Sequence, residues 1–305
     1  MSCLREASSS ALGFQRSRAY DERQTGSGKN PMEPTAIERW SHPPCRLLAP
    51  FIDRFWGWQS AGPAALPLLL PGTGSECLFH LRQPLLQSDG HSLPSAHLIC
   101  PREQTTQLHT PGALDFIAVR FKSGQLRHFT ARPFIELHDE FAAIETLWPG
   151  ETSALVQQLV QTVERATRLR LLERFLYRQL VQHHRPDEQA QDALIDRLYY
   201  APNQRIETLA NDWGWSTRHL ERRFKQAFAV TPKRFARLAR LHHCLRQLAL
   251  QPRREPLAVI LERGFSDQSH FIHETRALIG LPPGQLQALM SRGTHYYHAP
   301  SRQPD

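Results

Sequence analysis

The sequence predicts an α+β fold, in which a β-rich N-terminal domain with a helical hairpin precedes an all-α C-terminal domain with two helix-turn-helix motifs. Three observations lead to this prediction. Short apolar runs broken by Pro and Gly fill the first half, as in β-proteins. From about residue 151 the apolar residues recur at helical spacing. The last third repeats a helix–glycine turn–helix pattern within a basic segment.

The composition fits a globular chain of two domains. The chain has 305 residues, of which 40% are hydrophobic and 22% charged. Its five cysteines are scattered and odd in number, with no C-x-x-C pair, which argues against a disulfide framework and favours a reducing cytoplasm. The apolar run at 66–70 is too short to cross a membrane. We therefore expect a cytoplasmic protein.

The first 31 residues are rich in Ser, Arg, Gln and Gly and lack the apolar stretch of a signal peptide. We expect residues 1–35 to form a disordered tail, and we take Met32 as a candidate start of the protein. A second disordered tail is expected at 293–305.

Residues 36–185 are expected to form one domain. Its clearest strands are 76–81, 96–100 and 116–121, and turns are expected at 71–74 and 88–90. This pattern predicts an antiparallel β-sandwich or a small barrel. Two amphipathic helices follow, at about 151–165 and 167–184, with an apolar stripe that includes Val160 and Val163. The stripe fits a cover for the sheet and a dimerisation hairpin equally well, because it does not reveal which surface buries it.

Residues 186–191 interrupt the helix and predict a linker between the domains. From 192 to 292 the chain is expected to be helical, with helices near 192–200, 206–212, 217–227, 232–250, 256–263, 267–278 and 283–290. A proline at the start of the long helix suits a position whose N–H has no helical partner.

The repeat lies within this helical domain. Gly214 and Gly264 are 50 residues apart, and each is followed by an aromatic residue and a serine. In such a motif Gly reverses the chain, the aromatic residue fills the core and Ser caps the next helix. The same segment, residues 191–292, carries 16 Lys and Arg against 9 Asp and Glu, so nearly all of the chain's excess charge of +8 lies there. Two such motifs in a basic segment predict binding to double-stranded DNA.

Helical phase separates the buried from the exposed side of each second helix. Leu220 and Phe224 must face inward in the first, and Phe271 in the second. The outward side chains are candidates for reading base edges in the major groove; they are Arg218, Glu221, Arg222, Gln268, Ser269, His270 and His273. Basic residues near the helix ends are candidates for phosphate contacts; they are Lys225, Lys233, Arg234, Arg237 and Arg276. A helix of about 19 residues spans about 28 Å, close to one duplex turn of about 34 Å, so one chain could read two successive groove segments.

Several histidines and cysteines in the first half are of the types that bind metals, namely Cys77, His80, His91, His97, Cys100 and His109. Their spacing matches no tight ligand pattern, and in strands such residues are more often packing residues. The sequence therefore predicts no metal and no cofactor.

Residues 192–292 resemble the AraC/XylS family of bacterial transcriptional regulators. The second copy carries the resemblance most clearly, in the run from Gly264 to Phe271 followed by Gly280 and Pro283, and the first copy matches from Trp215 to Lys225. The resemblance implies that the outward side chains of both second helices face the bases. It also implies a β-rich, cupin-like effector-sensing domain, helices that dimerise, RNA polymerase as a partner and a small-molecule effector.

The second copy departs from the family pattern, with His273 where Arg is usual and Thr275 where Phe is usual, and Ala229 stands where the first copy often has Gly. These departures bear on the strength of the second recognition helix and leave the fold unaffected.

The leading hypothesis is a sequence-specific transcription regulator, an activator that responds to a small molecule, and not an enzyme. One alternative is a constitutive DNA-binding adaptor whose N-terminal domain only dimerises. The other is a cupin-type metal enzyme, which would need a His-x-His pair with a downstream Glu, and residues 43–140 contain no His-x-His. A pocket lined by apolar and polar groups would favour the sensor.

Overall fold

The computed structural model describes residues 36–100, 105–133, 136–137, 141–251 and 253–290. The expected tails at 1–35 and 293–305, and the candidate start at Met32, lie outside these residues.

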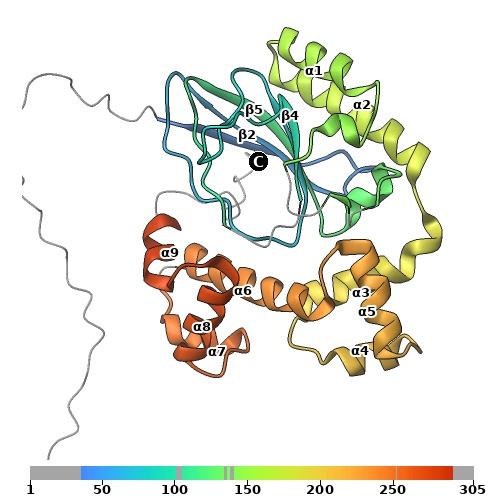
Figure 1. Ribbon diagram of the computed structural model, residues 1–305, viewed down its shortest axis with the longest axis vertical. Helices are drawn as coiled ribbons and strands as arrows, with labels where there is room; N and C mark the ends of the chain where they lie inside the picture. The colour runs from blue at the N-terminus through green and yellow to red at the C-terminus, as the bar shows by residue number, and fades with distance from the viewer. Residues whose placement is uncertain (1–35, 101–104, 134–135, 138–140, 252, 291–305) are drawn as a thin grey trace, which may run out of the picture. The chain divides into compact units, whose positions relative to one another are not determined.

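The N-terminal domain is built on one five-stranded antiparallel sheet with the strand order β1-β2-β5-β3-β4 (Figure 1). Its strands are β1 (Glu38–His42), β2 (Ile52–Ser60), β3 (Glu76–His80), β4 (Ala96–Ile99) and β5 (Leu114–Phe121). The three strands predicted from the sequence are confirmed as β3, β4 and β5. Strands β1 and β2 were not predicted. The middle of β2 is buried from Phe55 to Trp58 on both faces of the sheet, so it lacks the alternation of polar and apolar residues that marks a half-exposed strand.

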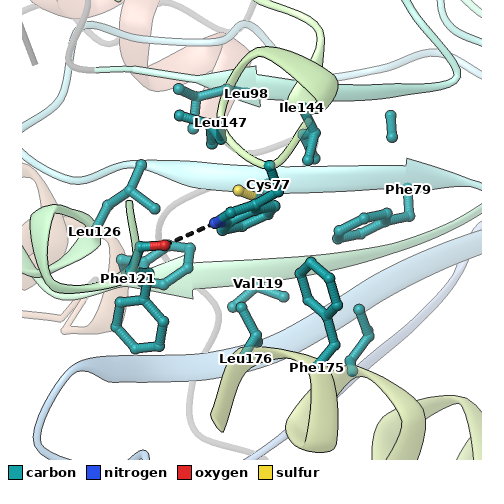
Figure 2. Packing of buried hydrophobic residues seen from close by; sticks show 14 of the residues in the cluster. Cys77, Phe79, Leu98, Val119, Phe121, Leu126, Ile144, Leu147, Phe175 and Leu176 are labelled. Carbon is teal, nitrogen blue, oxygen red and sulfur yellow. Dashed lines mark hydrogen bonds between the residues drawn. The ribbon is translucent and has the colours of Figure 1, made fainter. Parts of the chain in front are cut away.

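Helices cover one face of this sheet. They are α1 (Thr152–Gln161) and α2 (Arg165–His183), with the 3-10 turns η1 (Gln125–Phe129) and η3 (Ile144–Thr146) beside them. Figure 2 shows Phe175 and Leu176 of α2 facing Val119 of β5 in this core. Trp148 Nε1 donates to the carbonyl oxygen of Phe129 over 2.7 Å, which satisfies the one polar atom of that buried indole.

Loops cover the other face. They carry Leu69, Leu85, Leu93 and Leu108 onto a cluster centred on Trp56 and other side chains of the sheet. Isolated bridges such as Leu69–Thr106 and Leu86–His109 join these loops. Within the described ranges they form no second sheet, so the expected sandwich or barrel is wrong. Prolines are frequent in these segments, and each removes a backbone donor that a strand ladder would need.

The helical hairpin is confirmed as a cover for the sheet. Leu155, Leu159 and Leu172 are buried in the shared core. Val160 and Val163, which the predicted stripe included, are 48% and 90% exposed. Val163 is exposed because α1 ends at Gln161, before the stripe is complete. Dimerisation through this hairpin stays a prediction.

Residues 186–191 form regular structure instead of an open linker. They make the 3-10 turn η4 (Pro186–Glu188) and the first residues of α3 (Gln189–Tyr200), which begins three residues earlier than predicted. Buried Arg127 of η1 holds this segment, with its Nε 2.8 Å from Glu188 Oε2 and a second ion pair to Asp192. His128 Nε2 lies 3.2 Å from Asp192 Oδ2.

Apart from the earlier start of α3, the helices of the C-terminal domain lie within one residue of their predicted bounds. After α3 they are α4 (Ile206–Asp212), α5 (Thr217–Phe228), α6 (Pro232–Leu250), α7 (Pro256–Glu262), α8 (Gln268–Ile279) and α9 (Pro283–Met290). Two apolar clusters form its core. One joins α3, α4, α5 and the start of α6, and the other joins the rest of α6 to α7, α8 and α9. The two helix-turn-helix units therefore share one long helix.

Candidate nucleic-acid interface

The first helix-turn-helix unit consists of α4, a glycine turn and α5. Leu220, Phe224 and Phe228 face the core from α5. Gly214 in the turn has φ of 64°, a left-handed conformation that favours glycine. The Oγ of Ser216 accepts from the backbone N of His219 over 3.2 Å and so caps α5 at its N-terminus.

The opposite side of α5 is open to solvent. Arg218, Glu221, Arg222 and Lys225 project from this side, in agreement with the phase of the helix. Three of these four charged groups are cationic.

Two side chains that the sequence analysis did not assign support this surface. The ring of His219 packs edge-on against Trp215 at 5.1 Å, and its Nδ1 lies 3.3 Å from Arg222 Nη2. Arg223 lies over the Trp215 ring, 5.5 Å from its centroid. The spacing of Trp215, His219 and Arg222 at four and three residues places them on one side of the helix start and could have indicated this arrangement.

The second unit repeats the design with α7, a turn and α8. Phe265, Phe271 and Leu278 face its core. The cap of α8 is Asp267 and not the expected Ser266, because the Oδ1 of Asp267 accepts from the backbone N of His270 over 2.7 Å. The outward side chains are Gln268, Ser269, His273 and Arg276, all exposed.

His270 differs from the other candidate base readers. Its ring packs against Phe265 at 5.5 Å, and its Nδ1 accepts from the backbone N of Ser266 over 3.2 Å. The side chain is half-buried and serves to close the turn before α8. A base contact by His270 stays a prediction.

The candidate phosphate contacts fall into two groups. Lys225, Lys233 and Arg276 are exposed, and Arg234 is half-buried near the capped start of α6. Arg237 instead faces α8, where its Nε and Nη2 donate to the two carboxylate oxygens of Glu274 over 2.8 and 2.9 Å.

The ion pair of Arg237 and Glu274 joins α8 to α6. Glu274 is 7% exposed, and Arg240 Nη2 adds a third contact to it at 3.4 Å. Burial alone would raise the pKa of Glu274, but the hydrogen bond from Arg237 and the charges of Arg237 and Arg240 outweigh it, so the pKa lies below its usual range. The carboxylate is therefore held in its charged form.

Two of the departures from the family pattern have clear structural consequences. Thr275 is fully buried, and its hydroxyl donates to the carbonyl oxygen of Phe271 over 2.7 Å, so the polar group is satisfied within α8. Ala229 ends α5 with φ of 61°, a left-handed conformation that the described residues otherwise reserve for glycine.

The six candidate metal ligands do not come together. Cys77 and Cys100 lie in the core under the helices, whereas His80 and His97 stack at 5.0 Å on the β3 and β4 strands, beside Phe116 and Phe141. Burial lowers the pKa of His80 to about 4 and that of His97 to about 3, so both rings are neutral at neutral pH. His91 and His109 are exposed. Across the part of the chain that the structure describes, no three such side chains are placed to hold a metal ion.

A cleft of about 210 Å³ lies between the sheet and the helices α3 and α6. Four permanently cationic side chains line it against two carboxylates, Asp53 and Asp196. The cations are Arg54, Arg120, Lys122 and Arg246. Burial, with the charges of Arg263 and Arg246, lowers the pKa of His243 in the cleft wall to about 4. Arg54 is paired with Asp53, and Arg120 with the buried Glu76, so Lys122 and Arg246, set against Asp196, supply the excess of positive charge in the cleft.

The N-terminal domain also contacts both helix-turn-helix units directly. Leu70 is 3% exposed and belongs to the core of the second unit. His242 Nε2 lies 2.6 Å from the carbonyl oxygen of Pro71, and Thr105 Oγ1 donates to that of Ile279 over 2.6 Å. Burial lowers the pKa of His242 to about 4, so its neutral ring donates to this carbonyl.

At the first unit, the ring of Phe228 packs against the backbone of Gly124, where a Cβ would overlap it, and Ile195 Cδ1 lies 3.1 Å from that Cβ position. The glycine at the start of η1 thus allows the two domains to approach closely.

Comparison with known proteins agrees with this geometry. Residues 209–288 match a family described as a helix-turn-helix domain, and residues 41–143 match a domain of unknown function, DUF6597. Among curated proteins none matches the chain.

Among solved structures the chain is similar to ToxT from Vibrio cholerae. One ToxT structure has a TM-score of 0.44 and 10% identity, covering 84% of this chain and 99% of that one. A second, of unsaturated fatty acid bound wild-type ToxT, has a TM-score of 0.43 and 10% identity, covering 84% and 94%. Both likenesses are distant.

Two helix-turn-helix units on a shared helix, each with a polar outward side, define a DNA-binding protein. Residues 209–288 therefore form a helix-turn-helix domain of the matching family. Across the described residues no helix combines the length and apolar character needed to cross a bilayer.

Proposed function

We propose that the chain reads two adjacent major-groove segments of one duplex, one with α5 and one with α8. The observation that carries this proposal is that both helices project exposed polar side chains while their units share α6. In α5 the base readers would be Arg218, Glu221 and Arg222. In α8 they would be Gln268, Ser269 and His273, with His270 at the edge. Phosphate contacts would come from Lys225, Lys233, Arg234 and Arg276, and from Arg237 to the extent that Glu274 leaves it available.

Selection of binding sites from a randomised duplex library tests this proposal. We expect selected sequences to contain two short conserved segments whose centres are about one duplex turn, roughly 10 base pairs, apart. Arg222→Ala should weaken the preference in one segment and His273→Ala that in the other. A single conserved segment, lost with either variant, would contradict two-segment reading.

We also propose that the cationic cleft binds a compact anion, and that this binding regulates the protein. Support comes from the excess of positive charge and from the position of the cleft, because its lining includes Arg120 and Lys122 of the sheet domain and Tyr199 and Arg246 of the DNA-binding domain. An anion there would contact both domains at once, and would therefore favour the arrangement in which they meet. A carboxylate or phosphate group fits the lining.

The effector proposal is tested by thermal stability in the presence of small carboxylates and phosphate esters. We expect some of them to raise the melting temperature and to alter affinity for the selected duplex. The double variant Lys122→Gln, Arg246→Gln should lose both effects. Arg253→Gln, which removes an exposed charge outside the cleft, should retain them. If no anion acts on the wild type, the constitutive adaptor becomes the better description.

Activation through contact with RNA polymerase, homodimer formation and action in the cytoplasm belong to the same proposal. Exposed Tyr177 and Val181 on α2 offer an apolar surface for a second copy, at 44% and 68% exposure. The dimer is tested by comparing the sedimentation of the wild type with that of the double variant Tyr177→Ser, Val181→Ser.

Transcription from a promoter that carries the selected site distinguishes activation from repression.

A further inference from the structure

The two glycine turns of the repeat have different surroundings. Gly214 and Gly264 occupy the same position in their units, and both have left-handed backbone, with φ of 64° and 84°. A Cβ added at Gly214 would meet nothing within 4 Å. A Cβ added at Gly264 would lie 2.7 Å from Asn203 Cγ and 2.8 Å from Asn203 Oδ1. Of the two turn glycines, only Gly264 therefore has a described residue from another part of the chain packed against its Cβ position.

Asn203 stands at the entry of the first helix-turn-helix unit. It lies between α3 and α4, just before the first unit begins. Its Nδ2 donates to the carbonyl oxygen of Arg263 over 3.3 Å, in the residue that precedes Gly264. The contact thus joins the entry of the first unit directly to the turn of the second, without passing through α6.

The second turn is also held to α6 on its other side. Arg240 Nη1 donates to the carbonyl oxygen of Gly264 over 3.4 Å, and Arg263 Nε donates to Gln247 Oε1 over 2.6 Å. A cleft of about 330 Å³ lies beside these contacts and is lined by Asn203, Arg240 and Arg263, with Tyr200 and His243 in its wall. The turn therefore has two supports, one on the shared helix and one on the first unit.

We propose that Asn203 is a positioning residue that fixes the distance and angle between the two recognition helices. A single shared helix leaves the second unit able to bend and rotate about its contacts with that helix. A second contact away from the helix axis restricts this motion. Because the separation of half-sites is set by the geometry of the protein, Asn203 would set how many base pairs are tolerated between the two segments. This inference rests on the proposed two-segment reading.

The test measures affinity for three duplexes, which carry the selected site with its native spacing, with one base pair inserted, or with one removed. We expect the wild type to lose affinity sharply at both altered spacings. In Asn203→Ala the ratio of affinities for native and altered spacing should fall by about threefold to fivefold, as expected for the loss of one hydrogen bond. Asn203→Asp keeps the size but loses the donor, and should show the same change.

Two glycine variants separate positioning from backbone strain. Gly264→Ala and Gly214→Ala both place a side chain on left-handed backbone, so both should destabilise the protein. Only Gly264→Ala displaces Asn203, so only it should alter the spacing ratio. Asn203→Ala added to Gly264→Ala should cause little further change in that ratio, because each substitution alone already removes the same contact.

An unchanged spacing ratio in Asn203→Ala and Asn203→Asp, with both variants folded by circular dichroism, would overturn the positioning role and leave two-segment reading intact. Equal spacing effects of Gly214→Ala and Gly264→Ala would also overturn it. If the wild type itself binds one segment and ignores spacing, two-segment reading fails and the inference falls with it.

Discussion

Ala229 has a left-handed backbone conformation that its Cβ makes unfavourable. It ends α5 with φ of 61°, whereas Gly280 ends α8 in the corresponding place with φ of 81°. Left-handed backbone costs an alanine about 1 kcal/mol more than a glycine. We expect Ala229→Gly to stabilise the protein by about 1 kcal/mol in urea unfolding.

Gly280→Ala is the matched control for this prediction. A Cβ at Gly280 would meet nothing within 4 Å, so only backbone strain is added. It should destabilise the protein by a similar amount, about 1 kcal/mol. A destabilised Ala229→Gly variant would mean that the Ala229 side chain contributes packing that exceeds the strain.

Arg222 and Lys225 lie on the same exposed side of α5 but are assigned different roles. Arg222→Ala should weaken binding to the selected duplex by about 1–3 kcal/mol and relax sequence preference, since a base contact is lost. Lys225→Ala should weaken binding to selected and random duplexes alike and lower the salt dependence. Competition titrations at several salt concentrations measure both effects. Equal losses on both duplexes for Arg222→Ala would reassign it to phosphate.

The sequence predicted the orientation of a side chain well where helical phase determines it. It predicted the orientation poorly where a partner far along the chain determines it. Leu220 and Phe224 fix which way α5 faces, so Arg218 and Arg222 follow. Nothing near Arg237 in the sequence indicates Glu274, 37 residues later, as its partner. His270 looked exposed by phase alone, but its ring turns back to Ser266.

At the scale of elements, capping signals made the helices predictable. Ser216 and Thr231 each stand just before a predicted helix and accept from a backbone N three residues later, whereas the cap of α8 is Asp267 and not the serine before it. Strand β1 is short and mostly exposed, and β2 is buried on both faces, so neither shows period-two alternation. The single sheet with loop cover also escaped prediction, because alternation indicates a buried face without indicating what buries it.

The ion pair that attaches α8 to α6 should make the stability of the protein depend on pH. The folded state holds the pKa of Glu274 below its usual range, so its contribution to stability is complete above the ordinary glutamate pKa of about 4.3. The contribution is lost as the pH falls below that value and through the lower pKa of the folded state. Glu274→Gln should destabilise the protein near neutral pH by about 1–3 kcal/mol.

The difference in unfolding free energy between wild type and Glu274→Gln should shrink as the pH is lowered through this range. Urea unfolding at a series of pH values measures it. Glu221→Gln makes the same change on the exposed side of α5 and should leave stability unchanged across the series. A difference between wild type and Glu274→Gln that does not change with pH would show that the charge of Glu274 does not account for its contribution to stability.

In the whole molecule, the N-terminal domain packs against both helix-turn-helix units and so supports the DNA-binding domain. Gly124 meets Phe228 at the end of the first recognition helix, and Leu70 enters the core of the second unit. These contacts join positions more than 100 residues apart, and no local pattern marks them. The sequence could therefore predict the two domains but not the surfaces through which they meet.

Leu69 and Leu70 offer a direct test of this support, because they are neighbours with equal burial, each 3% exposed, and different destinations. Leu69 packs on the sheet within its own domain, whereas Leu70 packs with Leu241 and Phe265 in the core of the second unit. Each change to alanine removes a buried leucine and should cost about 2–5 kcal/mol.

Only Leu70→Ala should speed hydrogen exchange in α7 and α8 and weaken binding to the second DNA segment, because it opens a cavity beside those helices. Leu69→Ala should speed exchange in the sheet and leave α7 and α8 protected. If both variants loosen α7 and α8 equally, the two domains unfold as one unit and Leu70 has no separate role in supporting the second recognition helix.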